Sequence, residues 1–176
     1  MTIEKKLKKV MDDKKITLIY FKSIKYRDVM KDLVGIAYKK FRKICYITLN
    51  DPYATIISNL NIKEEKIVFI DCVTSTVESP KSKKNVIFVS SPHALTEISI
   101  SLEKAIKNKK VDFVIFDSIS AMLIYEDSFT IMKFIHRLVL TFRARSISAF
   151  FVIMKEDLSD ELMKDLAMFV DKIVGV

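Results

Sequence analysis

The residue of this chain that is best placed to take part in chemistry is a carboxylate that ends an apolar segment. Asp117 follows the run Phe113 to Phe116 and precedes Ser118, within the stretch VDFVIFDSIS at 111–120. A carboxylate in such a position supplies the hard oxygen ligand that Mg²⁺ takes when it bridges nucleotide phosphates. A strand-end carboxylate also commonly caps the turn that follows it. Asp117 alone is therefore compatible with a structural role as well as a metal-binding one.

A phosphate-binding loop is the second requirement for that chemistry. A Walker A loop, G-x-x-x-x-G-K-[ST], needs glycine because its amides close around the phosphates and only glycine adopts the required torsions without a Cβ clash. The chain has two glycines, Gly35 and Gly175, and neither precedes a Lys-Ser or Lys-Thr pair. The sequence therefore predicts that no Walker A loop is present.

Other classes of active site have no better support. The sequence contains neither G-x-S-x-G nor H-E-x-x-H. Cys45 and Cys72 lie in or directly after apolar runs, so we expect two small buried hydrophobic residues. His93 and His136 have no partner at ligand spacing, and we expect them at the surface. We predict no catalytic residue, no metal site and no cofactor.

Length and composition indicate one globular unit. The chain has 176 residues, of which 50% are apolar, and we expect a single domain over 1–176. Its apolar runs are far shorter than the roughly 20 residues of a spanning helix, and no apolar signal segment follows the basic N-terminus. We therefore expect a cytoplasmic protein without membrane contact.

The net charge of +8 raises the question of a polyanionic partner. The lysines are spread over several clusters, at Lys5 to Lys9, Lys39 to Lys43, Lys81 to Lys84 and Lys104 to Lys110. This spread favours a solvated surface over a nucleic-acid site, which stays open as an alternative.

Short apolar runs alternate with segments of helical period, which is the pattern of βαβ units around a parallel sheet. The predicted strands are Ile16 to Phe21, Ile44 to Leu49, Ile67 to Asp71, Val86 to Ser90, Phe113 to Asp117, Ala149 to Met154 and Lys172 to Val176. The predicted helices are Thr2 to Asp13 (an amphipathic helix within 1–14), Ile24 to Arg42, Leu95 to Asn108, Ser128 to Arg145 and a short one N-capped by Ser159. Asp51 to Tyr53 is predicted as a turn, and Ser79 to Lys84 as an exposed basic loop.

The succession of these segments resembles a known family. VDFVIFDSISAMLIYED is followed by FIHRLVLTFRARSI, then AFFVIM, then LMKDLAMFVDKIV, and the upstream strands are ITLIYF and KICYITLNDP. This order resembles the archaeal KaiC-like and RadA-like branch of the RecA superfamily over residues 16–176. The resemblance implies a RecA-like, three-layer α/β/α fold of the P-loop NTPase type, with a mostly parallel central sheet.

The chain departs from that family where the family performs catalysis. In the segment 21–28 the bulky Ile24 and Tyr26 stand where small residues are needed, and Arg27 and Asp28 fall near the usual Lys-Thr pair. Bulky side chains there would occupy the phosphate volume, and the carboxylate of Asp28 would repel phosphate. The family's general base, a glutamate after the second strand, is replaced by Asn50 and Asp51.

These departures imply a degenerate member of the family that does not hydrolyse ATP. We expect a non-enzymatic regulatory or interaction module whose partner is a protein, either a competent RecA/KaiC-like relative or a second copy of the chain. One alternative is a sensor that binds ATP or ADP without hydrolysis, with Lys22, Lys25 and Arg27 as an anion site. The other is a nucleic-acid-binding module that uses the lysine clusters. The vestigial or candidate anion and nucleotide positions are Lys25, Arg27, Asp28, Asp51, Asp117 and Ser118.

Overall fold

The computed structural model describes residues 5, 7, 8, 15–60 and 64–176. Seven strands form one sheet in the order β4-β3-β2-β5-β6-β1-β7, and every pair of neighbouring strands is parallel. The strands are β1 (Ile16–Phe21), β2 (Ile44–Thr48), β3 (Ile67–Asp71), β4 (Val86–Phe88), β5 (Phe113–Asp117), β6 (Ser148–Met154) and β7 (Lys172–Gly175). The predicted α/β fold with a parallel central sheet is confirmed.

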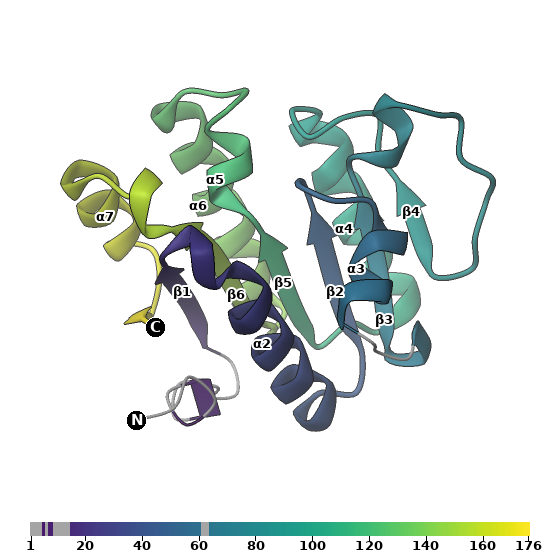
Figure 1. Cartoon of the computed structure of the whole chain (residues 1–176), viewed down its shortest axis with the longest axis horizontal. Coiled ribbons are helices and arrows are strands. Elements are labelled where there is room, and N and C mark those ends of the chain that lie inside the picture. Colours follow the sequence, from purple (N-terminus) through teal and green to yellow (C-terminus); the bar gives the residue numbers. More distant parts are fainter. Residues whose placement is uncertain (1–4, 6, 9–14, 61–63) are drawn as a thin grey trace.

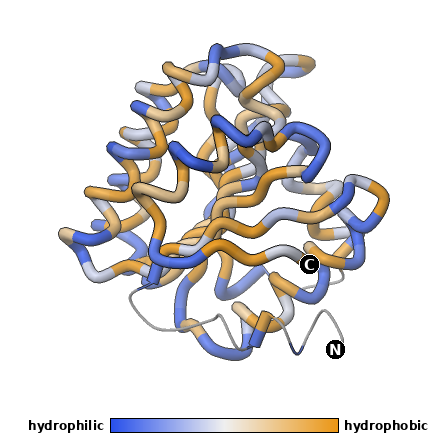
Figure 2. The backbone as a smooth tube through the Cα atoms, turned by 90° about the vertical axis from the view of Figure 1, so that its left-hand side faces the viewer, coloured by the Kyte–Doolittle hydropathy of each residue, from blue (hydrophilic) through white to orange (hydrophobic). Residues whose placement is uncertain are grey.

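Helices cover both faces of this sheet. They are α2 (Tyr26–Lys40), α3 (Tyr53–Leu60), α4 (Leu95–Lys109), α5 (Ile119–Met122), α6 (Ser128–Ala144) and α7 (Asp160–Ala167). In Figure 1, α2 and α3 lie in front of the sheet and α4 and α6 lie behind it. Because helices cover both faces of the sheet, the strands in Figure 2 are largely hydrophobic. The helices show hydrophobic and hydrophilic residues in alternation.

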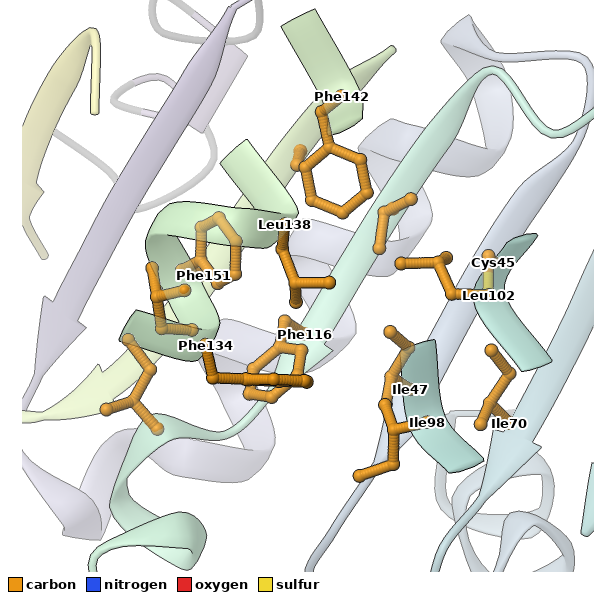
Figure 3. Close-up of a cluster of buried hydrophobic side chains, with 14 of the residues drawn as sticks. Cys45, Ile47, Ile70, Ile98, Leu102, Phe116, Phe134, Leu138, Phe142 and Phe151 are labelled. Atoms are coloured by element: carbon orange, nitrogen blue, oxygen red, sulfur yellow. The ribbon is translucent and has the colours of Figure 1, made fainter. Parts of the chain in front are cut away.

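Two hydrophobic clusters, one on each face, hold the three layers together. Figure 3 shows the cluster under α4 and α6, where Phe116 and Phe151 from the sheet meet Leu138 from α6. The opposite cluster joins α2 and α3 to alternate residues of the same strands, including Tyr46 and Phe150. The predicted apolar stripe of α6 is buried at Ile131, Phe134, Ile135, Leu138, Val139 and Phe142.

The sheet order places one candidate site. The connection from β2 runs toward β3 and that from β5 runs toward β6, although β2 and β5 are neighbours. Connections that leave adjacent strands in opposite directions open a crevice at the carboxyl ends of the strands, where α/β sheets bind ligands. Asn50, Asp51 and Asp117 all follow or end these two strands.

Several local predictions need correction. Tyr53 is not part of a turn but begins α3, whose first backbone N–H is capped by the Asp71 carboxylate at 2.9 Å. That cap comes from a distant strand, so the segment carries no local N-cap signal. Helix α5 is also additional to the prediction, β4 ends at Phe88, and a 3₁₀ turn over Ser23–Lys25 precedes α2.

Other local predictions are confirmed. Ser159 caps α7 by accepting a hydrogen bond from the Leu162 N–H, and both cysteines are free and buried. Most of the predicted helix within 1–14 lies outside the described residues, although Leu7 packs into the cluster beneath α2. In the described part of the chain, no helix is long and apolar enough to cross a bilayer.

Candidate functional site

Asp117 is fully buried at the carboxyl end of β5, and two tyrosines cover it. The hydroxyl of Tyr26, from the first turn of α2, donates to Asp117 Oδ2 at 2.5 Å. The hydroxyl of Tyr46, from the middle of β2, donates to the same oxygen at 2.5 Å. Asp117 Oδ1 is also buried and has no hydrogen-bond partner among the described residues. Oδ2 of Asp117 therefore accepts two hydrogen bonds, whereas Oδ1 accepts none from the described residues.

The pKa of Asp117 follows from this environment. The pKa of this carboxyl is raised to about 6, chiefly by burial and in smaller part by the negative charge of Asp51, while the hydrogen bonds from Tyr26 and Tyr46 act to lower it. The phenol pKa values of Tyr26 and Tyr46 are raised by burial first and then by the charge of Asp117. The two tyrosines therefore act as hydrogen-bond donors across the neutral pH range.

A second buried strand-end aspartate has a different set of partners. Asp71 accepts hydrogen bonds from the backbone N–H groups of Tyr53, Val73 and Thr74. It also accepts one from the Thr74 hydroxyl at 2.6 Å, so both of its oxygens are satisfied. Asp71 is a structural cap for two connections, whereas Asp117 keeps an unsatisfied oxygen at the switch point.

Ser118 and Asn50 continue the polar layer beside Asp117. Ser118 Oγ accepts a hydrogen bond from Asn50 Nδ2 at 3.2 Å and from the Ala121 N–H at 3.2 Å, which caps α5. Asn50 stands after β2, where the resemblance places a general base, and its amide cannot accept a proton usefully at neutral pH. Ser118 is buried and serves as a cap.

A cavity of about 230 Å³ lies next to the tyrosines, between α2 and α3. Arg27, Asp28 and Asp51 line it, together with Tyr26 and Tyr46. Lys25 lies on the exposed 3₁₀ turn and lines neither this cavity nor the shallow one beside Asn50. Of the six sequence-predicted positions, five thus gather around the switch point, and Lys25 does not.

The residues present do not suit a magnesium nucleotide at Asp117. Its Oδ2 already accepts two phenols, and a pKa raised by burial disfavours the anionic form that a hard cation needs. In the described part of the chain, no three His, Cys, Asp or Glu side chains come together as metal ligands. The cavity beside Asp117 is lined by two carboxylates, Asp28 and Asp51, as well as by the cations Arg27 and Lys31.

Sequence reasoning missed the role of the two tyrosines. The sequence predicts only that Tyr26 occupies the phosphate volume, and nothing in the strand ICYIT marks Tyr46 as a polar partner. A useful signal was available, because a tyrosine in a strand buried on both faces needs a partner for its hydroxyl.

Comparison with known proteins agrees with this fold. The chain superimposes on a KaiC-like protein from the hyperthermophilic archaeon Pyrococcus horikoshii OT3 with a TM-score of 0.67 and 9% identity, covering 93% of this chain and 71% of that one. It also superimposes on an uncharacterized protein from Pyrococcus horikoshii, solved in complex with an unknown peptide, with a TM-score of 0.70 and 11% identity, covering 94% of this chain and 78% of that one. Both likenesses are likenesses of fold. A comparison with curated proteins finds no match.

A family model extends the agreement to the sequence. The model described as "ATPase: KaiC" matches residues 38–173, which include Tyr46, Asp51, Asp117 and Ser118. Tyr26, Arg27 and Asp28 precede the matched range. The matched range covers most of the chain, so the chain belongs to the KaiC ATPase family.

Proposed function

We propose that this protein is a KaiC-family domain that does not hydrolyse ATP and acts as a regulatory or interaction module. The observation that carries the proposal is the pair of hydrogen bonds from Tyr26 and Tyr46 to Asp117 Oδ2. These hydrogen bonds hold the Asp117 carboxylate against two phenols. ATP hydrolysis would instead require this carboxylate to face a metal ion.

Two further features support the loss of hydrolysis. The segment 21–28, where the resemblance places the phosphate loop, contains no glycine and forms a 3₁₀ turn followed by a helix that begins at the bulky Tyr26. Asn50, at the position of the family's general base, donates a hydrogen bond to Ser118, and its amide is a poor proton acceptor at neutral pH. The segment therefore lacks the glycines of a Walker A loop, and the position after β2 carries an amide in place of the family's glutamate.

The test is a phosphate-release assay with ATP and Mg²⁺, paired with calorimetric titration of ATP and ADP. We expect release no faster than in protein-free buffer and no binding heat. Magnesium-dependent turnover that Asp117→Ala abolishes would overturn the proposal. Micromolar ATP binding that Arg27→Ala removes, without turnover, would instead support the nucleotide-sensor alternative.

A protein partner is favoured by apolar side chains at the carboxyl edge of the sheet. Ile24 is 90% exposed after β1, Ile124 is 75% exposed after β5, and Phe129 is 63% exposed at the start of α6. Val77 and Tyr125, in connections at the same edge, are also exposed. Exposed apolar side chains collected at one edge are typical of protein interaction sites.

We therefore propose that this edge binds a second copy of the chain or a KaiC-family ATPase. The test is sedimentation of the chain alone and mixed with such an ATPase, using the double variant Ile24→Ser/Phe129→Ser. We expect association to weaken in that variant and to persist in Ile100→Ser/Leu140→Ser, whose residues are exposed on the outer helix faces. Equal association of the two double variants would contradict the assignment of this edge.

A further inference from the structure

The amino edge of the sheet, opposite the switch point, carries a dense group of lysines. Lys43 directly precedes β2, Lys66 directly precedes β3, and Lys84 stands two residues before β4. Ile44 of β2 pairs with Ile67 of β3 and with Phe113 of β5, so the residues that lead into these strands lie at one level. We define the edge lysines as Lys43, Lys66, Lys83, Lys84, Lys109 and Lys110. Figure 1 shows the chain entering β2 to β5 at the lower ends of these strands, which is the edge where these lysines stand.

Carboxylates neutralise little of this charge. Among the described residues, only Lys83 of the edge lysines pairs with a carboxylate, that of Glu64 at 3.1 Å. Lys43, Lys66 and Lys109 donate to backbone carbonyls at 2.8, 3.1 and 3.4 Å, which leaves their charge uncompensated. Of the described residues that lead into these strands, Glu65 and Asp112 also carry carboxylates, and Asp112 pairs with Arg42.

The ammonium groups are close enough to repel one another. The pKa of Lys43 is lowered by partial burial first and then by repulsion from Lys109 and Lys84. Because these cations lie close together and have few carboxylate partners among the described residues, an external anion would relieve their mutual repulsion.

Helix ends explain only part of the lysine excess. The C-termini of α2, α3 and α4 lie at this edge, and each contributes about half a negative charge. Three such ends amount to about one and a half charges. Five edge lysines without a carboxylate partner exceed this amount, so complementing the helix dipoles does not account for the surface.

The neighbouring side chains identify the kind of anion. In the described part of the chain, none of the large exposed apolar residues stands directly before β2, β3, β4 or β5, so no described side chain at these strand starts can insert into a lipid surface. The nearby rings are Phe41, which is buried, and Tyr38, which lies half-buried with Lys66 Nζ 5.0 Å from its centroid. No exposed ring is therefore available to stack on a nucleic-acid base, as single-strand binders require.

The spacing fits a continuous phosphate backbone. Neighbouring strands are about 4.8 Å apart, so the four strand ends span about 14 Å. A duplex carries one phosphate charge per about 1.7 Å of its axis and therefore presents several phosphates over that length. We propose that the edge lysines form a sequence-independent binding surface for the phosphate backbone of a double-stranded nucleic acid.

Fluorescence anisotropy with a labelled DNA duplex of about two helical turns tests this surface, across a range of salt concentrations. Five unpaired lysines predict a slope of log affinity against log salt of about −4.5, which for Lys84→Gln/Lys109→Gln/Lys110→Gln falls to about −1.8. The control variant Lys22→Gln/Lys133→Gln/Lys155→Gln removes the same charge at the opposite, carboxyl edge of the sheet and is expected to keep the steeper slope. Thermal melting of both triple variants checks that they fold.

Parallel titrations separate the sources of phosphate. A duplex RNA is expected to bind in the same way, and a single strand of equal length more weakly. Binding to anionic vesicles in the absence of duplex binding would overturn the proposal, as would tighter binding of the single strand. Equal salt slopes for the two triple variants, or no duplex binding at low salt and micromolar protein, would overturn it as well.

Discussion

At the residue scale, the environment of Asp117 gives the protein a characteristic pH dependence. The folded-state pKa of about 6 lies above the ordinary aspartate pKa of 3.8, so the folded state holds this proton more tightly than the unfolded chain does. The stability contributed by protonated Asp117 is fully present below about pH 4 and is lost as the pH rises through about 6. A difference of about two pKa units corresponds to about 3 kcal/mol.

The substitution Asp117→Asn removes this titration and retains an oxygen that can accept from the tyrosines. We expect the free energy of unfolding of the variant to improve relative to the wild type by up to about 3 kcal/mol as the pH rises from about 4 to about 7. Urea unfolding at several pH values measures this change. The variant Asp28→Asn removes the same formal charge from the surface and is the matched control. A difference that stays constant over this pH range would contradict the description of Asp117.

The tyrosine hydroxyls give a second prediction at this scale. Tyr26→Phe removes a hydrogen bond that lowers the pKa of Asp117, so that pKa should rise above its wild-type value. The loss of stability still begins near pH 4, where the unfolded chain loses this proton, but it continues to a higher pH and is larger in total, which the same urea titration detects. Tyr20→Phe, on β1 and without a hydrogen bond to Asp117, should leave the profile unchanged. A lower Asp117 pKa in Tyr26→Phe would be inconsistent with the observed contact.

At the element scale, the two glycines show how local propensity and packing differ. Gly35 lies inside α2, and a Cβ built on it meets nothing within 4 Å. We expect Gly35→Ala to stabilise the protein by about 0.5 to 1 kcal/mol, because alanine loses less backbone entropy in a helix. At Gly175 in β7, a Cβ would lie 2.7 Å from the Tyr20 ring. Gly175→Ala should therefore be destabilising, and thermal unfolding of both variants tests the contrast.

Element boundaries depended on where the capping groups come from. Helix α7 was predicted with its cap because Ser159 is adjacent in sequence to the turn that it caps. Helix α3 was mistaken for a turn because its cap, Asp71, belongs to β3. Local caps are readable in a sequence, whereas caps supplied by another strand become visible only after the sheet has formed.

At the scale of the whole molecule, one sheet supports two hydrophobic layers and should unfold as one unit. Leu33 is fully buried in the layer of α2, and Leu138 is 2% exposed in the layer of α6. We expect Leu33→Ala and Leu138→Ala each to cost about 2 to 5 kcal/mol through lost contacts and cavity formation. Because the strands contribute to both layers, each variant should retain a single urea transition with an unchanged slope. A second transition in either variant would show that the layers unfold separately.

The whole molecule also has two unlike edges. The carboxyl edge presents exposed apolar side chains beside the covered Asp117, and the amino edge presents the edge lysines. The parallel arrangement produces this separation, because all residues that precede strands gather on one side and all that follow strands gather on the other. Lysine clusters that are scattered along the sequence thereby become one surface.

The sequence by itself determined the fold class, because apolar runs of strand length alternating with amphipathic helical segments allow few arrangements other than a covered parallel sheet. It also determined that no glycine-rich phosphate loop exists, since glycine content needs no structure to be read. Only the tertiary structure decided that Tyr26 and Tyr46 share one oxygen of Asp117, and that Lys43, Lys84 and Lys109 repel one another. The partners in these contacts lie far apart in the chain, and their proximity depends on strand order and register, which no local pattern encodes.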